Sequence, residues 1–279
     1  MTSRDRLRGR FTLGPPQMYK VGYRQFIEKR LSIVDKTGSL VDFIPNAIQD
    51  KYLEMGTGKD VILKARQQGF SSLILGVFTA DFILRENSRS VIVADIADNA
   101  IELLDRVKLY IQSYGEKTGT PIQLKYNSKY ELYNAAINSR YTIGTADKVD
   151  FGRSKTITNL HLSEFAFYRD AEKLLAGVLQ AVVPDGRTII ETTANGFGFF
   201  KDFWDRSENG ETGFSPLFFK ASDFYSPEFL EQKKRELGRL FTQEYPETAL
   251  EAFVTSGESY FDKYALGNYL QEVEGVREL

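Results

Sequence analysis

Cysteine is absent from this 279-residue sequence, and its absence excludes two kinds of structure at once. Without thiols, the chain can form neither a disulfide bond nor a zinc site with thiolate ligands, which fits a reducing cytoplasm. Histidine occurs once, as His161, so a zinc site built on a pair of histidines is excluded as well. We therefore expect His161 to be a buried or edge residue of a strand.

Long apolar runs are also missing. No run reaches the roughly 18 to 20 residues of a membrane-spanning helix, and the basic N-terminus leads into no apolar signal core, so we expect no membrane association. The formal net charge of −2 argues against tight, static binding to a phosphate backbone, although a local basic patch could still grip and release one. The 42% hydrophobic content suffices for a full core in one large domain.

Strand and helix patterns alternate through most of the chain, which is typical of a wound α/β sheet, mostly parallel, with helices on both faces. Two short segments, 123–127 and 131–136, interrupt the alternation and are expected to form an inserted hairpin. Residues 1–40 are expected to be an N-terminal arm or small lid, because Gly14-Pro15-Pro16 breaks any regular element there. The expected strands are 60–65, 90–95, 139–145, 156–163, 187–194 and 215–221, and the expected helices are 71–85, 97–113, 171–181, 197–206 and 227–238.

Residues 61–75 have the pattern of a buried strand, a short polar loop and an apolar helix with hydroxyls in its first turn. Loop amides and a helix N-terminus favour a bound anion there, and a first-turn hydroxyl such as Ser71 can reach a magnesium ion. The usual P-loop pattern would place glycine and lysine where this chain has Lys64 and Phe70. The cation that a nucleotide requires must then come from Lys64 or Arg66. An ordinary strand-turn-helix is the alternative.

A second segment, 156–164, is an apolar β-rich run that ends in a carboxylate. This is the form of a Walker B strand, whose end carries the magnesium shell and the residue that polarises the attacking water. Ser163 stands where an aspartate is usual, so Glu164 would be the general base, its alternative role being to cap the following helix. A third strand, 187–194, leads to Asn195, which would lie beside the γ-phosphate if the three strands are neighbours.

Together these segments resemble the ATPase domain of the large terminase subunit of tailed bacteriophages. The family's Walker B strand often ends in a Ser-Glu pair, as at Ser163-Glu164, and its coupling motif is similar to Thr192-Thr193-Ala194-Asn195-Gly196. Its adenine-recognition segment is similar to residues 43–49, and its closing stretch to residues 244–253. The family's variant P-loop has an R-Q-x-G-x-[ST]-[ST] core, matched here by Arg66, Gln67, Gly69, Ser71 and Ser72.

The resemblance implies a P-loop NTPase of the additional-strand, catalytic-glutamate type that binds ATP with Mg²⁺. It implies that Glu164 is catalytic and that Ser71, Ser163 and Glu164 hold the metal. In the family a basic residue earlier in the loop commonly replaces the P-loop lysine, which again indicates Lys64 or Arg66. The nucleotide-binding residues that it implies are Gln49 at the adenine edge, with Lys64, Arg66, Gln67, Gln68, Gly69, Ser71, Ser72 and Asn195 around the phosphates.

Residues 144–154 lack periodicity and are expected to form an exposed loop near the nucleotide. Ring motors complete each active site with an arginine from the neighbouring subunit, whose guanidinium spreads its charge over the transferring phosphoryl oxygens. Arg153 is our first candidate for this arginine, which would be catalytic together with Glu164, and Arg140 is our second candidate. A plain surface arginine is the alternative for either.

The function implied is that of an ATP-driven motor that packages double-stranded DNA into a procapsid, in the host cytoplasm. Its expected partners are double-stranded DNA, a portal protein, a small terminase subunit and further copies of this chain in a ring. We expect the ATPase domain to span residues 41–262 and residues 263–279 to be a linker, with no nuclease activity in this chain. A different P-loop translocase of helicase type, or a non-catalytic assembly module that keeps the fold, are the alternatives.

Overall fold

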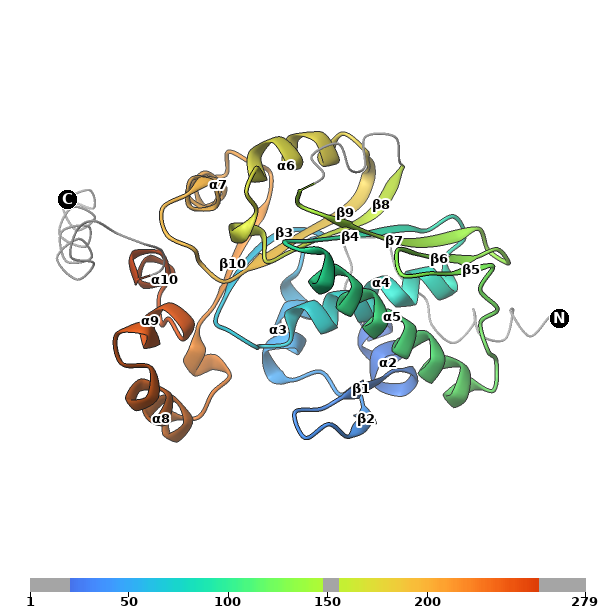
Figure 1. The fold of residues 1–279 in the computed structure, drawn as a ribbon, viewed down its shortest axis with the longest axis horizontal. Coiled ribbons are helices and arrows are strands. Elements are labelled where there is room, and N and C mark those ends of the chain that lie inside the picture. The colour runs from blue at the N-terminus through green and yellow to red at the C-terminus, as the bar shows by residue number, and fades with distance from the viewer. Residues whose placement is uncertain (1–20, 148–155, 256–279) are drawn as a thin grey trace.

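The computed structural model describes residues 21–147 and 156–255, and the expected linker at 263–279 and the residues of the arm before 21 lie outside this part. At its centre is an eight-stranded sheet with the order β10-β3-β9-β8-β4-β7-β6-β5 (Figure 1). The strands from β10 to β7 run parallel, and β6 and β5 continue the sheet, with β6 antiparallel to β7 and β5 antiparallel to β6. The expected α/β class with a mostly parallel sheet is confirmed.

The elements follow the expected alternation closely. The strands of this sheet are β3 (Lys59–Lys64), β4 (Arg89–Ala94), β5 (Tyr126–Asn127), β6 (Glu131–Asn134), β7 (Ser139–Thr145), β8 (Ile157–Ser163), β9 (Val182–Thr192) and β10 (Ser215–Phe219). The α-helices are α2 (Val21–Arg30), α3 (Ala47–Met55), α4 (Phe70–Leu84), α5 (Ala97–Thr118), α6 (Ala171–Leu179), α7 (Phe199–Glu208), α8 (Pro227–Leu237), α9 (Phe241–Glu244) and α10 (Ala249–Thr255). A separate small hairpin pairs β1 (Ser32–Val34) with β2 (Leu40–Asp42).

Two boundaries differ from the sequence expectation by five residues, and the others by less. β9 begins at Val182, before the expected start at residue 187, because Val182 already pairs with Ile157 of β8 across a bulge. α5 continues past the expected end at residue 113 to Thr118, where Gly119 ends it in the left-handed conformation with φ of 66°. Neither extension changes the order of the elements.

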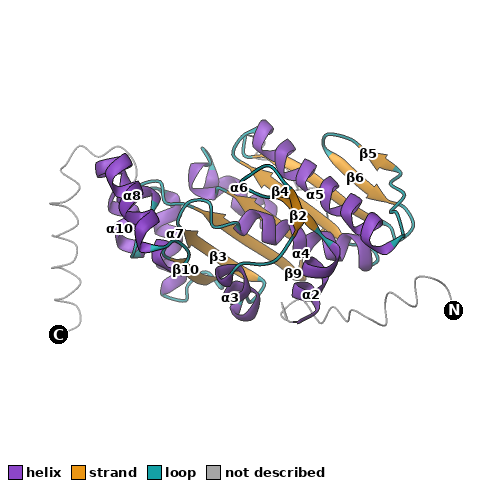
Figure 2. Ribbon diagram, turned by 90° about the horizontal axis from the view of Figure 1, so that it is seen from below, coloured by secondary structure: helices purple, strands orange, loops and turns teal. Residues whose placement is uncertain are grey.

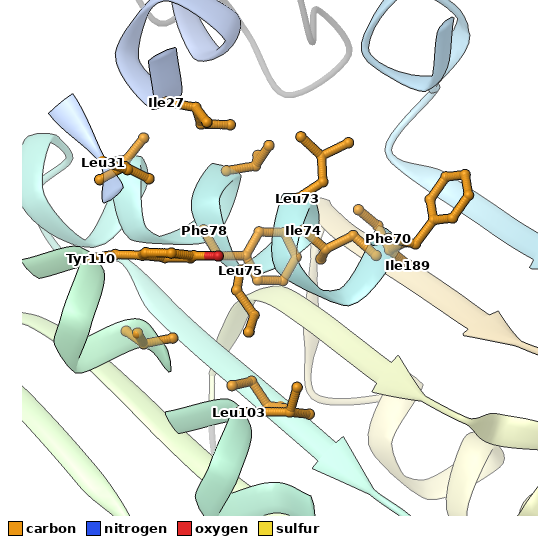
Figure 3. Packing of buried hydrophobic residues seen from close by; sticks show 14 of the residues in the cluster. Ile27, Leu31, Phe70, Leu73, Ile74, Leu75, Phe78, Leu103, Tyr110 and Ile189 are labelled. Carbon is orange, nitrogen blue, oxygen red and sulfur yellow. The ribbon is translucent and has the colours of Figure 1, made fainter. Parts of the chain in front are cut away.

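Helices cover the sheet from both sides (Figures 1 and 2). Helices α2, α4 and α5 share one apolar core on one face, and α6 and α7 pack in a second core on the other. Phe70, Ile74 and Phe78 of α4 lie in the first core, between the sheet and the residues Ile27 and Tyr110 of the outer helices (Figure 3). A helix enclosed in this way must be apolar on nearly all sides, and α4 is.

The second half of the expected N-terminal arm packs into this main core. Tyr23, Phe26 and Ile27 of α2 are buried, and the Tyr23 hydroxyl donates a hydrogen bond to Asp81 Oδ1 of α4 at 2.8 Å. Residues 21–30 are therefore part of the structural unit that carries the P-loop helix, and the boundary expected near residue 40 does not coincide with a break in the packing.

The inserted hairpin is confirmed and forms the edge of the sheet. Its strands β5 and β6 pair antiparallel, and β6 pairs in turn with β7. The guanidinium carbon of Arg140 lies 3.8 Å from the centre of the Tyr133 ring, and Arg140 also forms an ion pair with Glu131. These contacts hold the hairpin to the amino end of β7.

A buried ion pair joins α4 to β9. Asp81 of α4 pairs with Arg187 of β9, and both side chains are almost fully buried. Arg187 Nε donates to Asn159 Oδ1 of β8 at 3.0 Å, and Asn159 Nδ2 donates to Asp81 Oδ2 at 3.1 Å. Buried charges are tolerated when they are paired and hydrogen-bonded, so this network fixes α4 against β8 and β9.

Within residues 21–147 and 156–255, we find no helix that is both long enough and apolar enough to cross a membrane.

Candidate active site at the carboxyl ends of β3, β9 and β8

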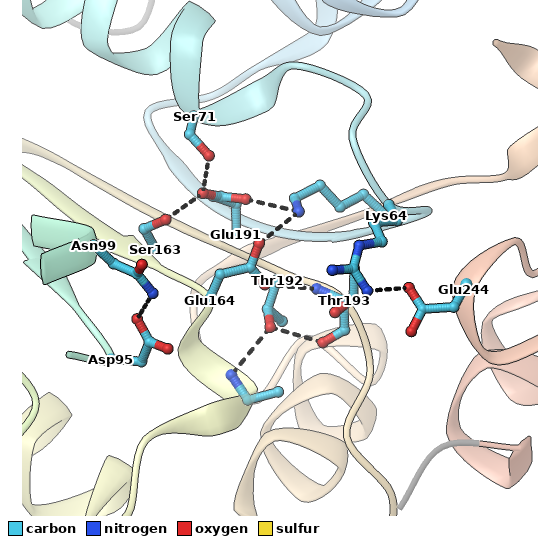
Figure 4. Close-up of polar contacts among 12 residues, drawn as sticks. Lys64, Ser71, Asp95, Asn99, Ser163, Glu164, Glu191, Thr192, Thr193 and Glu244 are labelled. Atoms are coloured by element: carbon cyan, nitrogen blue, oxygen red, sulfur yellow. Dashed lines mark hydrogen bonds and ion pairs between the residues drawn. The ribbon is translucent and has the colours of Figure 1, made fainter. Parts of the chain in front are cut away.

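The loop from Ala65 to Gly69 connects the carboxyl end of β3 to the N-terminus of α4, as the sequence predicted. Two residues in this loop have positive φ, Gln67 at 56° and Gly69 at 82°. A positive φ turns the chain sharply, and glycine adopts it without steric cost. The strands β3, β9 and β8 are neighbours, so the three segments that the sequence singled out meet at one edge of the sheet (Figure 4).

A capping box on α3 supports this loop from outside. Asn46 Oδ1 accepts a hydrogen bond from the Gln49 amide, and Gln49 Oε1 accepts one from the Asn46 amide. The side-chain nitrogens of the same two residues reach the loop. Gln49 Nε2 donates to the Gly69 carbonyl at 2.6 Å, and Asn46 Nδ2 donates to the Gln68 carbonyl at 3.2 Å. Both polar atoms of Gln49 are thus engaged in shaping the loop, and its adenine-recognition role stays a prediction.

Replacing Gly69 with alanine is expected to destabilise the fold by about 2 kcal/mol or more. Alanine is strained in the left-handed conformation of this residue, and its Cβ displaces a neighbouring side chain. A Cβ at this position would lie 2.8 Å from Gln49 Nε2. Gly38 offers a matched control, since its φ of +83° is nearly the same but a Cβ there meets nothing within 4 Å. Gly38→Ala should cost only about 1 kcal/mol in urea unfolding. Equal losses would show that the Gln49 contact contributes nothing.

Arg66 and Gln68 face the C-terminal helices. Arg66 Nη1 lies 2.8 Å from Glu244 Oε2, and its side chain is 60% exposed. The Tyr225 hydroxyl donates to the Arg66 carbonyl at 2.7 Å, and Gln68 Nε2 donates to the Lys220 carbonyl at 2.9 Å. The pair with Glu244 attaches the closing stretch to the P-loop and orients the Arg66 guanidinium, while the other two bonds attach the segment that follows β10.

Lys64 has the opposite environment. Its side chain is only 5% exposed, and Nζ lies 3.1 Å from Glu164 Oε1 and 3.2 Å from Glu191 Oε2. Burial opposes the ammonium charge, but the attraction of Glu191 and Glu164 outweighs it and raises the pKa of Lys64. Of the two candidate cations, Lys64 is the one that lies in the site and contacts the predicted general base.

Glu164 follows the last residue of β8 and turns back towards the P-loop. Its φ of 56° is a left-handed conformation, which non-glycine residues adopt mainly where the surroundings impose it. Its Oε2 accepts a hydrogen bond from the Thr193 amide at 3.3 Å. Its carbonyl accepts from the Phe167 amide of the 3-10 helix Phe165–Phe167, but its side chain makes no capping bond to that helix. The carboxylate therefore does not act as the cap. Burial is the main cause that raises the pKa of Glu164, Glu191 raises it further, and Lys64 counteracts both.

Glu191 of β9 is the residue that the sequence analysis missed. It is fully buried, and its Oε1 accepts hydrogen bonds from the hydroxyls of Ser71 and Ser163, each at 2.7 Å (Figure 4). His161 Nε2 lies 3.3 Å from the same oxygen. Burial opposes the charge of Glu191, but Lys64 and the His161 contact outweigh it, so the pKa of Glu191 is lowered. The sequence contained one signal for this residue, which was a charged side chain within an apolar strand.

Comparison with solved structures finds this fold in large terminases of bacteriophages. The ATPase domain of the large terminase of Thermus phage P74-26 aligns with a TM-score of 0.56 and 18% sequence identity, over 73% of this chain and 93% of that one. The bacteriophage HK97 large terminase aligns with a TM-score of 0.61 and 15% identity, over 80% of this chain and 52% of that one. The chain has the fold of a phage large terminase ATPase domain. No protein-family model and no curated sequence matches it.

A third terminase, from a thermophilic bacteriophage, adds nucleotide-bound states to the comparison. Its complex with ATP-γ-S aligns with a TM-score of 0.53 and 11% identity, over 71% of this chain and 50% of that one. Its complex with ADP aligns with a TM-score of 0.52 and 13% identity, over 68% of this chain and 48% of that one. This chain therefore spans about half the length of the HK97 terminase and of the thermophilic phage terminase.

The terminase ATPase fold brings together only some of the predicted site residues. Ser72 lies at the P-loop, but its hydroxyl accepts from Arg106 Nη1 of α5 at 3.1 Å. Asn195 is exposed, and its amide donates to the Ala166 carbonyl at 3.3 Å. Arg140 lies at the amino end of β7, opposite the edge that carries Lys64, and Arg153 lies outside the described residues. The residues that converge are Lys64, Ser71, Ser163 and Glu164, joined by Glu191.

The donor set of this terminase fold suits magnesium that arrives with a nucleotide. In the described ranges, no three or more His, Cys, Asp or Glu side chains form a group that could hold a metal ion by themselves. Magnesium prefers oxygen ligands and is usually bound through one or two carboxylates together with substrate phosphates and water. The hydroxyls of Ser71 and Ser163, both bonded to the Glu191 carboxylate, meet that description.

Proposed function

We propose that this chain is the ATP-hydrolysing motor domain of a terminase that packages double-stranded DNA. One observation carries the proposal. In a terminase ATPase fold, a buried lysine from the end of β3 faces a glutamate that follows β8, in front of the N-terminus of α4. This arrangement supplies a cation for phosphates, amides for an anion and a general base within one site.

The chemistry follows from these groups. Lys64 would neutralise the β- and γ-phosphates, and the first-turn amides of α4 would bind phosphate oxygens. Because phosphates compete with Glu164 for the Lys64 ammonium, nucleotide binding would release the carboxylate to accept a proton from the attacking water. Magnesium supplies charge neutralisation at the phosphates when it is bound. Ser71 and Ser163 are the hydroxyl groups placed to hold it, and Glu164 is bonded to Lys64.

The wider function is proposed on the same basis. The terminase of the thermophilic bacteriophage binds ADP and ATP-γ-S in structures of this fold, which supports ATP as the nucleotide here. Double-stranded DNA, a portal protein and a small terminase subunit are the partners that we propose, with the chain acting as a ring at the procapsid in the host cytoplasm.

Phe70, at the usual place of the P-loop lysine, is buried against Phe219 with ring centres 4.7 Å apart, so it acts in packing.

Mixing two inactive variants tests the proposal. If Arg153 completes the site of a neighbouring subunit, Arg153→Ala chains keep Glu164, and Glu164→Gln chains keep Arg153. A mixture should then regain part of the wild-type rate, because one subunit boundary can combine both intact halves. Wild-type turnover per subunit should also rise with protein concentration, as mass action forms these boundaries. Strong turnover by a dilute monomer that Arg153→Ala leaves unchanged would contradict this assembly.

Two simple readouts separate the alternatives. Absence of nucleotide binding and of hydrolysis by the wild-type chain, alone and with portal protein, would favour a non-catalytic assembly module. Hydrolysis stimulated by duplex DNA and accompanied by strand separation would favour a helicase-type translocase. Stimulation by duplex DNA without strand separation is the result that we expect from a packaging motor.

A further inference from the structure

We propose that Glu191 supplies the magnesium-side carboxylate that the Walker B strand lacks at Ser163. The carboxylate that is usual at the end of β8 is then supplied by the neighbouring strand β9. This inference rests on the proposed ATPase function, because it assigns a residue to the metal that accompanies the nucleotide. It leaves the attacking water to Glu164, so that the two carboxylates of the site have separate roles.

Strand register places Glu191 beside the missing aspartate. β8 and β9 are parallel neighbours, and Ser163 is the register partner of Glu191. Side chains at paired positions of adjacent strands point to the same face of a sheet. The Ser163 hydroxyl donates to Glu191 Oε1 at 2.7 Å, so the carboxylate reaches the position in front of the Walker B strand. A serine at 163 leaves the space and the hydrogen bond that this longer side chain needs.

The second observation is the partner of the P-loop hydroxyl. Ser71, in the first turn of α4, is the residue placed to hold magnesium, and its hydroxyl donates to Glu191 Oε1 at 2.7 Å. Glu164 instead contacts Lys64 and the Thr193 amide. An acidic group that shares a metal with the P-loop hydroxyl must lie within a few ångströms of it, and Glu191 is the carboxylate that does (Figure 4).

Charge balance gives the third step. Glu191 is fully buried, and its Oε2 lies 3.2 Å from Lys64 Nζ. When phosphates attract Lys64, Glu191 loses this counter-charge. A buried carboxylate without a cation is strongly unfavourable. A divalent cation beside Ser71 would restore the balance, so metal and nucleotide should bind this site together.

The test is the metal dependence of nucleotide affinity, measured with ATP-γ-S in Mg²⁺ and again in EDTA. In the wild-type chain Mg²⁺ should tighten binding clearly. Glu191→Gln should reduce that tightening at least about tenfold. The decisive variant moves the carboxylate back, as Ser163→Asp combined with Glu191→Gln, and it should recover most of the metal response. Electron paramagnetic resonance of Mn²⁺ with ADP should rank the three proteins in the same order.

Several controls make each outcome decisive. Glu164→Gln should keep the metal response while losing turnover, because it removes the base and leaves Glu191 intact. If Glu191→Gln does not fold, the double variant decides alone, since it preserves the net charge of the site. A wild-type metal response in Glu191→Gln, or its absence in the double variant, would overturn the inference. A wild-type chain that binds no nucleotide at all would instead refute the proposed function.

Discussion

Replacing Glu164 with glutamine is expected to lower ATP turnover at least about a hundredfold while ATP affinity stays near the wild-type value. Glutamine keeps the size of the side chain but cannot accept the proton of the attacking water. Glu164 is the carboxylate that follows β8, held in a left-handed backbone conformation and bonded to the Thr193 amide, so that its position is defined before substrate binds. Steady-state hydrolysis and equilibrium binding of a labelled nucleotide measure the two quantities separately.

Glu172 provides the matched control for this substitution. It lies in the first turn of α6 and is exposed, so Glu172→Gln changes the same functional group away from the site. We expect it to leave turnover within about twofold of wild type, as for surface substitutions that remove no specific interaction. Wild-type hydrolysis by Glu164→Gln would eliminate Glu164 as the general base.

Replacing Lys64 with alanine is expected to have the second large effect, a loss of at least about a hundredfold in turnover together with weaker nucleotide binding. Sequence alone left Lys64 and Arg66 as equal candidates for the displaced P-loop cation. The structure separates them, because Lys64 is buried between Glu164 and Glu191, whereas Arg66 is 60% exposed and paired with Glu244. Arg66→Ala is the natural control and should retain most of the activity.

Stability must be followed alongside, because Lys64→Ala leaves the fully buried carboxylate of Glu191 and the partly exposed one of Glu164 without their cation. Breaking such a pair can cost about 3–5 kcal/mol, so affinity should be measured well below the unfolding temperature of the variant. Wild-type affinity and turnover in a folded Lys64→Ala chain, with a large loss in Arg66→Ala, would reverse the assignment of the two cations.

Local pattern was enough to predict part of the site. The strand-loop-helix at 61–75 and the carboxylate at the end of the 156–164 run both follow from periodicity and composition within a few residues. The alternation of elements also gave the parallel sheet, and the pattern of residues 123–136 gave the hairpin. The spacing of Asn46 and Gln49 fits a capping box, so their support of the loop was within reach of the sequence as well.

Other features depend on contacts between distant segments, which local sequence pattern does not determine. Glu191 belongs to the site only because β9 lies between β3 and β8, an order that sequence alternation does not give. The orientation of Arg66 depends on Glu244, 178 residues further along the chain. The burial of Tyr23 depends on α4 and Asp81 in the same way, so the first helix was predicted as part of an arm.

The two links between α4 and β9 have a mechanical consequence. Ser71 bonds to Glu191 near the start of the helix, and Asp81 pairs with Arg187 near its end. At 1.5 Å per residue, the ten residues from Ser71 to Asp81 separate these attachments by about 15 Å along the helix. A helix that is bonded to a strand at two separate points is restrained from rotating against it. We therefore expect α4 and β9 to move together as one rigid unit. If the loop before α4 binds phosphate as proposed, a displacement there is expected to reach the segment of β9 around Arg187.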